Sequence, residues 1–257
     1  MAVEKDTIYY HRAYKRAHED RPNIARLLFV FVLLLDIVIF IFYPDIVDYL
    51  TLKVRNVLVT LGYYPTIFHW KMLWRPIAAL DMPTVYPSPL FSVGMLIFST
   101  LLIVVVIAVS RFPRLFAAFL TFLSIVNGVS AAFFILTPME FPYTIGDFCM
   151  LYIGTEVGLW ILIPVILAIA LYSTPTTLAS KVLFIVFNVA YSIIFGTVRY
   201  LVFLSAMQDH SVLFMAEFYF IFGPLFDFVY VVGFYTLYVS NLSELIQHSF
   251  RRWKWLY

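Results

Sequence analysis

The sequence predicts an all-α integral membrane protein with about six transmembrane helices and an amphipathic helix on the outer membrane surface. Of the 257 residues, 63% are hydrophobic and only 12% are charged, whereas a soluble domain carries roughly 25% charged residues. Six runs of mostly apolar residues reach about 18 residues, the length that crosses a bilayer core. The short loops and the tails also divide into those with lysine and arginine and those without, which orients the spans. The lipid bilayer is therefore the first expected partner.

The six apolar runs are the predicted transmembrane spans, and together they make residues 1–257 one polytopic membrane domain. Charged or turn-forming residues flank most of them. In chain order the spans are Ala25–Tyr43, Leu90–Val109, Leu115–Leu136, Phe148–Leu171, Lys181–Ala206 and Val212–Val239.

The distribution of lysine and arginine orients the spans. The N-terminal tail, the loop after the second span, the start of the fifth span and the C-terminal tail carry these residues. The loops after the third and fifth spans carry none, and the loop after the first span carries Lys53, Arg55, Lys71 and Arg75 but weighs less because it is long. The positive-inside rule then places both termini in the cytoplasm. The tail of residues 1–24 mixes basic and aromatic residues, which is typical of an amphipathic segment on an anionic membrane surface.

One long segment, residues 44–88, is predicted to lie outside the membrane on the outer face. It begins with Pro44 and Asp45, a helix start signal. Apolar residues then recur at helical spacing: Ile46, Leu50, Val54, Val57 and Leu58. We expect an amphipathic helix on the membrane surface here. Trp70 and Trp74 follow at the spacing of interface anchors, and we interpret His69 beside them as structural.

The composition argues against several kinds of site. Cys149 is the only cysteine, so neither an intrachain disulfide nor a cysteine-cluster metal site can form. The five histidines lie outside the predicted spans, which argues against a haem pair. The net charge of +2 and the lack of a long basic tract argue against nucleic acid as a partner. We expect no metal and no cofactor.

Away from the cytoplasmic ends of the predicted spans, five charged side chains fall inside them: Asp36, Glu156, Arg199, Glu217 and Asp227. With the orientation above, all of them lie in the outer half of the membrane or near its midplane. An arginine at the centre of a membrane helix costs about 2.5–3.5 kcal/mol on insertion scales, so it needs partners. We predict that Arg199 pairs with Glu156, with Asp227 or Asp36 as a second partner. Both a structural pair and a functional pocket remain open.

Cys149 lies seven residues before Glu156, so the two side chains share a helix face about two turns apart. A thiol near a base or an arginine can act as a nucleophile. A single buried cysteine more often packs as a small inert hydrophobe.

The second half of the chain resembles a known family. The stretch TEVGLWILIPVILAIALYSTPTTLASKVLFIVFNVAYSIIFGTVRYLVFL, from Thr155 to Leu204, is similar to the core of the exosortase/archaeosortase family. The resemblance covers about residues 148–240. It implies a polytopic enzyme that cuts and transfers C-terminally tagged proteins at the outer membrane face. It also implies a place in the cell envelope, at the inner (cytoplasmic) membrane of a bacterium.

The family pattern has a cysteine, a lysine, an arginine and a histidine in order, and this sequence matches only part of it. Lys181 and Arg199 match the lysine and the arginine. Glu156 stands at the cysteine position, Asp227 stands near the histidine position, and Gly196 replaces an asparagine three residues before the arginine. The resemblance therefore implies a catalytically degenerate member.

Three functions compete. The favoured one is a non-catalytic, exosortase-like scaffold or partner-binding subunit of a membrane or cell-envelope complex, with other membrane proteins as partners. The second is an active cysteine protease or transpeptidase, in which the alignment slips by two turns and the candidate catalytic residues are Cys149, Arg199 and His210. The third is a subunit of a transporter or energy-coupling complex, whose acids would form a relay. Against it, no acid lies in the cytoplasmic half of a span.

Overall fold

The computed structural model describes residues 22–109, 113–138, 140–172, 174 and 176–250. Within this part of the chain, six helical segments are long and apolar enough to cross a membrane. They are Asn23–Thr60, Pro89–Ala108, Arg114–Leu136, Ile145–Tyr172, Leu178–Asp209 and Val212–Asn241. The chain is therefore a mainly helical integral membrane protein, as predicted. The basic residues of the two tails and Arg111 lie outside the described residues.

The described chain divides into two compact units that share several helices. The first contains the residues up to Ile41, the segment Trp160–Tyr191 and the residues from Gly233 onward. The second contains Phe42–Leu159 and Ser192–Val232. Helices α5 (Ile145–Tyr172) and α6 (Leu178–Asp209) therefore contribute to both units.

The first unit is held by apolar packing and by hydroxyl contacts. Leu28, Leu167 and Ile185 are almost fully buried in it. Tyr238, on helix α8 (Phe226–Phe250), packs its ring against Phe184 and contacts the Ser180 hydroxyl at 2.9 Å. Lys181, the lysine that the family resemblance matches, is also buried in this unit, at 3% exposure, and donates to the carbonyl of Tyr172.

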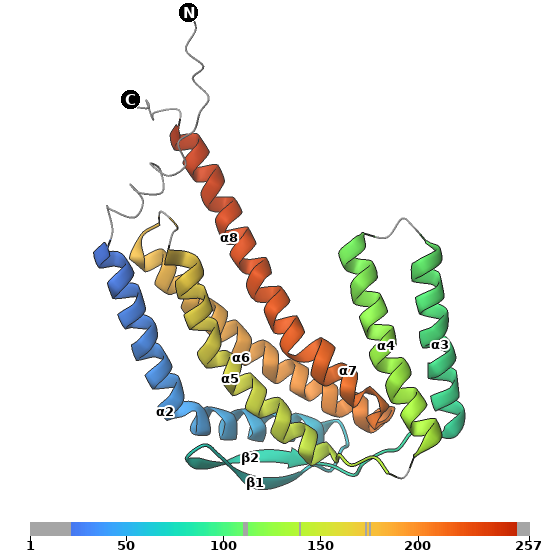
Figure 1. The fold of residues 1–257 in the computed structure, drawn as a ribbon. Coiled ribbons are helices and arrows are strands. Elements are labelled where there is room, and N and C mark those ends of the chain that lie inside the picture. The colour runs from blue at the N-terminus through green and yellow to red at the C-terminus, as the bar shows by residue number, and fades with distance from the viewer. Residues whose placement is uncertain (1–21, 110–112, 139, 173, 175, 251–257) are drawn as a thin grey trace, which may run out of the picture. The chain divides into compact units, whose positions relative to one another are not determined.

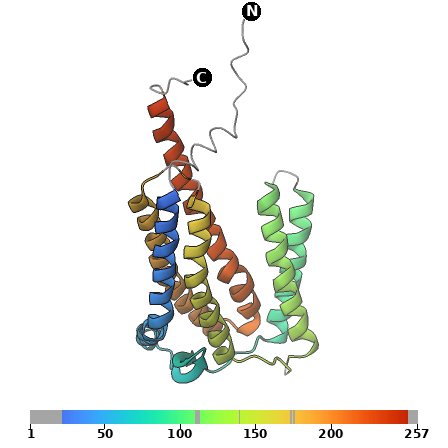
Figure 2. The ribbon, with the colours of Figure 1, turned by 60° about the vertical axis from the view of Figure 1, so that its left-hand side comes forward.

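In the second unit, helices α3 (Pro89–Ala108) and α4 (Arg114–Leu136) form an antiparallel pair and lie side by side (Figures 1 and 2). Ser88 caps α3 by accepting from the amide of Phe91. The faces that the two helices bury are rich in small and polar residues: Ser92, Ser99 and Val106 on α3, and Ser124, Asn127, Ala131 and Phe134 on α4. Small residues let membrane helices approach closely, which explains this pairing without a large apolar core.

Helix α2 (Pro22–Thr60) corrects one predicted boundary. The sequence predicts a separate amphipathic helix from Pro44, whereas residues 22–60 form one helical segment that includes Pro44. At 1.5 Å per residue, its 39 residues are far longer than a bilayer core of about 30 Å. The part after Tyr43 therefore serves as the amphipathic segment. Its buried face consists of Val47, Thr51, Val54 and Leu58, whereas Val57, predicted to lie on this face, is exposed.

The amphipathic part of α2 packs against a β-hairpin that the sequence did not predict. Strands β1 (Thr66–Met72) and β2 (Arg75–Asp81) pair in antiparallel register from Thr66↔Asp81 to Met72↔Arg75. Asp48 accepts a hydrogen bond from the amide of Ala78 at 2.7 Å, and Thr51 donates to its carbonyl at 3.3 Å. These contacts satisfy the outer edge of β2 at Ala78 and fix the helix against the hairpin.

The turn of the hairpin explains why the sequence did not reveal it. Two-residue turns usually carry glycine, asparagine or aspartate at their positive-φ positions. Here Leu73 adopts φ 55°, so the usual turn signature is missing. The conformation is one that leucine seldom adopts.

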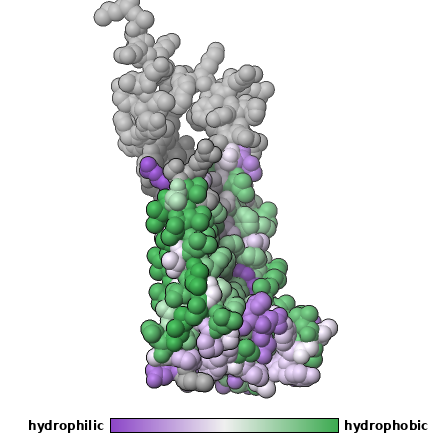
Figure 3. Space-filling model, turned by 90° about the vertical axis from the view of Figure 1, so that its right-hand side faces the viewer, coloured by the Kyte–Doolittle hydropathy of each residue, from purple (hydrophilic) through white to green (hydrophobic). Residues whose placement is uncertain are grey.

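The outer surfaces of the helices are apolar, as contact with lipid requires. Leu90 on α3 is 84% exposed and Leu115 on α4 is 88% exposed. Figure 3 shows hydrophobic side chains over most of the helix surface that faces the viewer. In water such a surface would be an aggregation liability, whereas in a bilayer it is the expected boundary with the acyl chains.

Candidate functional site: a buried acid–arginine cluster

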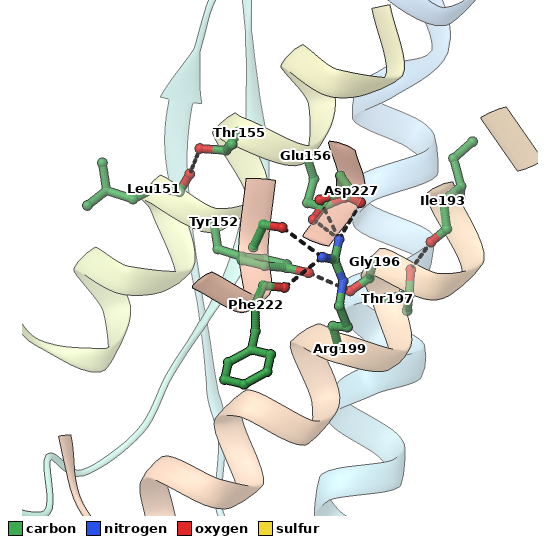
Figure 4. Close-up of polar contacts among 11 residues, drawn as sticks. Leu151, Tyr152, Thr155, Glu156, Ile193, Gly196, Thr197, Arg199, Phe222 and Asp227 are labelled. Carbon is green, nitrogen blue, oxygen red and sulfur yellow. Dashed lines mark hydrogen bonds and ion pairs between the residues drawn. The ribbon is translucent and has the colours of Figure 1, made fainter. Parts of the chain in front are cut away.

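Arg199 is the centre of a buried polar cluster in the second unit (Figure 4). Its side chain comes from α6, and only 6% of the residue is exposed. Nη2 donates to Glu156 Oε1 of α5 at 2.7 Å and to both carboxylate oxygens of Asp227 of α8, each at 2.7 Å. The pairing of Arg199 with Glu156 predicted from the sequence is therefore present, and Asp227 is the second partner.

A break in the sixth apolar span supplies two further hydrogen-bond acceptors for Arg199. Met215–Phe220 form the short helix α7, and a π turn, Ile221–Leu225, links it to α8. Inside this turn Gly223 has the non-helical angles φ −86° and ψ −119°, and Pro224 has no N–H to donate. The interrupted helix leaves the carbonyls of Phe222 and Gly223 within reach of Arg199 Nη1, at 2.7 and 3.0 Å.

Aromatic side chains and one glycine enclose the cluster. Tyr152 donates its hydroxyl to the carbonyl of Gly196 at 2.9 Å and stacks on Tyr200 at 5.6 Å. The guanidinium carbon of Arg199 lies 5.1 Å from the centre of the Phe195 ring. Such packing excludes water and strengthens every charge interaction inside the cluster.

Gly196 leaves space that the Glu156 carboxyl group occupies. A Cβ built on Gly196 would lie 2.9 Å from Glu156 Cδ and would overlap the Glu156 Oε2 atom. Oε2 is buried and has no hydrogen-bond partner in the described structure. The glycine thus permits the close approach of α5 and α6 that brings Glu156 to Arg199.

The other two acids predicted to lie in spans do not bind Arg199. Glu217 belongs to α7, is 6% exposed, and its Oε1 atom is buried without a hydrogen-bond partner in the described structure. Asp36 lies on α2 in the first unit. The structure therefore selects Glu156 and Asp227 from the four acids that the sequence offers.

The alternative trio Cys149, Arg199 and His210 is not assembled. Cys149 is fully buried, and its thiol lies beside the Tyr200 hydroxyl, which also accepts from the amide of Leu80. His210 is exposed, and its ring packs edge-on against Phe214. Within the described part of the chain, no hydrogen bond joins any two of these three side chains. The thiol, the guanidinium and the imidazole do not form one site.

The sequence did not predict some members of the cluster. Tyr152 and the carbonyls of Phe222 and Gly223 were not predicted as partners of Arg199 or its neighbours. The Gly223–Pro224 pair inside an apolar span was the available signal, because such a pair interrupts a helix and exposes its carbonyl groups.

The described residues contain no group of three or more histidine, cysteine, aspartate or glutamate side chains placed to hold a metal ion. In comparisons with known proteins, no family model, no curated protein and no solved structure matches the chain.

Proposed function

We propose that this chain is an exosortase-like membrane protein that does not catalyse peptide transfer. In this proposal it serves as a scaffold or partner-binding subunit of a membrane or cell-envelope complex. One observation carries it: the positions that the family resemblance assigns to cysteine and histidine hold Glu156 and Asp227, and both bind Arg199. In this proposal the three positions of the family's catalytic set are in contact, with Glu156 and Asp227 in place of the cysteine and the histidine.

The chemistry of the cluster favours a structural role. Acyl transfer needs a nucleophile and a base within hydrogen-bonding reach, with a third group to orient the base. A carboxylate bound to a guanidinium is a weak nucleophile, and an aspartate cannot replace an imidazole near neutral pH. The two terminal nitrogens of Arg199 are already engaged by two carboxyl groups and two carbonyls, which leaves few donors for a substrate.

A scaffold role follows from what the cluster connects. It ties α5, α6 and the π turn together within the second unit, and buried ionic groups can specify one packing arrangement of helices. In the same unit, α4 packs against α7, which leads into the π turn, so the α3–α4 pair adjoins a segment that the cluster fixes. We propose that other membrane protein subunits bind to this assembly.

The proposal predicts that Cys149→Ala leaves both the role of the protein in the cell and its assembly intact. The thiol is fully buried beside Tyr200, and the hydrogen-bond partners of Arg199 among the described residues do not include it, so we expect its loss to remove packing but no chemistry. The measurement is the set of proteins that co-purify in mild detergent, together with the phenotype of cells that carry only the variant.

If Cys149→Ala abolished function while the protein stayed abundant and folded, the non-catalytic proposal would be wrong. His210→Ala provides the matched test, because the active-enzyme alternative needs both residues. Loss of function in both variants, with normal folding, would favour the cysteine protease or transpeptidase.

A second prediction concerns orientation: both termini are proposed to be cytoplasmic, in the inner membrane of a bacterium. In a Cys149→Ala background, Pro142→Cys should react with an impermeant thiol reagent added to intact spheroplasts. Thr177→Cys, in the loop on the opposite side, should react only after the membrane is opened. Both positions are exposed. The reverse labelling pattern would overturn the proposed topology.

A further inference from the structure

The acid–arginine cluster contains more acidic groups than its single cation can balance. Glu156, Asp227 and Arg199 are 5%, 1% and 6% exposed. Both carboxyl groups lie on the same guanidinium nitrogen, and the two also interact directly with each other. Two ionised carboxylates at such close range, out of water, would repel each other and leave one uncompensated negative charge.

The groups around the cluster do not provide a second positive charge. Helix α5 contributes Tyr152, α8 contributes Tyr230, and the π turn contributes two carbonyl oxygens. All of these are neutral, and the carbonyls present the negative ends of their dipoles. Among the described residues, Arg199 is the one cation that interacts with either carboxyl group.

The two acids contact Arg199 unequally. Asp227 accepts from Nη2 with both of its oxygens, whereas Glu156 accepts with Oε1 alone. Glu156 Oε2 is buried against Gly196 and receives no hydrogen bond from the described residues. A charged oxygen without a donor is costly when buried, so Glu156 gains more from being neutral than Asp227 does.

We propose that Glu156 and Asp227 together form a buried proton-binding site that holds one proton. Asp227 is the ionised partner of Arg199, and Glu156 carries the proton, so the cluster as a whole is neutral. The arrangement resembles paired carboxylates that share a proton because they cannot both ionise, here with an arginine as the third member. The inference rests on the contacts of the cluster and not on the proposed scaffold function.

Single and double neutral amide variants of the two acids should differ in effect, because one proton is shared between two carboxyl groups. Glu156→Gln replaces a protonated acid with a neutral amide of similar shape, and Asp227→Asn leaves Glu156 to ionise and take over as the partner of Arg199. Each single variant therefore keeps one carboxylate for one guanidinium. The double variant Glu156→Gln/Asp227→Asn leaves Arg199 buried without any carboxylate.

Infrared difference spectroscopy and thermal unfolding of the full chain in detergent test this. The spectra are recorded in a Glu217→Gln background, because Glu217 is a second buried acid that can contribute its own band. At neutral pH this protein should show the carbonyl stretch of a protonated carboxylic acid, and the band should weaken when Glu156→Gln or Asp227→Asn is added. The unfolding midpoint should change little in each single variant and fall clearly in the double variant. Glu217→Gln is the matched control, since Glu217 is equally buried but does not bind Arg199.

In the Glu217→Gln background, a carboxylic-acid band that is as strong in both Glu156→Gln and Asp227→Asn as without them would overturn the proposal, because the band would then not come from the pair. The proposal also fails if either single isostere lowers the midpoint as much as the double variant, since both acids would then be needed as charges. Neither result bears on the Cys149→Ala test, so the proton site and the scaffold function can fail independently.

Discussion

Replacing Arg199 with alanine is expected to lower the free energy of unfolding by about 3–5 kcal/mol, the usual cost of breaking a buried ion pair from one side. The substitution removes the cation that Glu156 and Asp227 share and also the donors to the carbonyls of Phe222 and Gly223. An ionised Asp227 would then be buried without a partner. We expect the protein to lose both stability and its co-purifying subunits.

Chemical or thermal unfolding in detergent measures the effect, with Arg75→Ala as the matched control. Arg75 pairs with Asp45 at 3.0 Å, but the two side chains are 45% and 55% exposed. An exposed pair of this kind contributes only about 0.2–1 kcal/mol, and salt screens it further. An equal loss of unfolding free energy in the two variants would contradict the prediction that Arg199 stabilises the protein as the shared partner of two buried acids.

Gly196→Ala is expected to destabilise the protein by about 1–3 kcal/mol, the range for added volume in a packed interior. The new Cβ would overlap the carboxyl group of Glu156. That carboxyl group is the end of a flexible side chain, but moving it would pull Oε1 away from Arg199 Nη2. The cost therefore exceeds the gain in helix propensity that alanine normally brings.

Two comparisons separate this steric effect from a general effect of glycine substitution. Gly158→Ala on α5 should be tolerated, because a Cβ there meets nothing within 4 Å. In a Glu156→Ala background, Gly196→Ala should cost little, since the overlap is gone, and the coupling between the two sites appears as non-additivity. Additive losses in this cycle would show that Gly196 matters for some other reason.

The sequence was sufficient for the features that depend on local composition. Apolar runs of membrane-spanning length predicted six helices, and the described residues contain six such helices, one of which carries Arg199. The pairing of Arg199 with Glu156 was also predictable, because both residues lie at similar depth in neighbouring spans and an unpaired arginine in a membrane is costly. Both predictions use one-dimensional quantities: length, hydropathy and depth.

The hairpin and the continuity of α2 could not be predicted in the same way. Leu73 occupies the positive-φ turn position without a residue type that marks it. The strand Arg75–Asp81 is buried from Ile77 to Leu80, so it lacks the alternating pattern of a half-exposed strand. Its stability depends on Asp48 and Thr51, which lie some 30 residues earlier in the chain.

The sequence by itself determined that this chain spans a membrane with six helices and that Arg199 must find acidic partners in it. Hydropathy and the cost of a buried charge depend on each segment alone, so they can be estimated from the sequence without knowledge of the fold. Only the tertiary structure decided which acids those partners are, and that the π turn around Gly223 adds two carbonyls. The identity of the partners depends on the close approach of α5 to α6 at Gly196 and on the interrupted helix before Asp227. Both features arise from contacts between segments that are distant in the sequence.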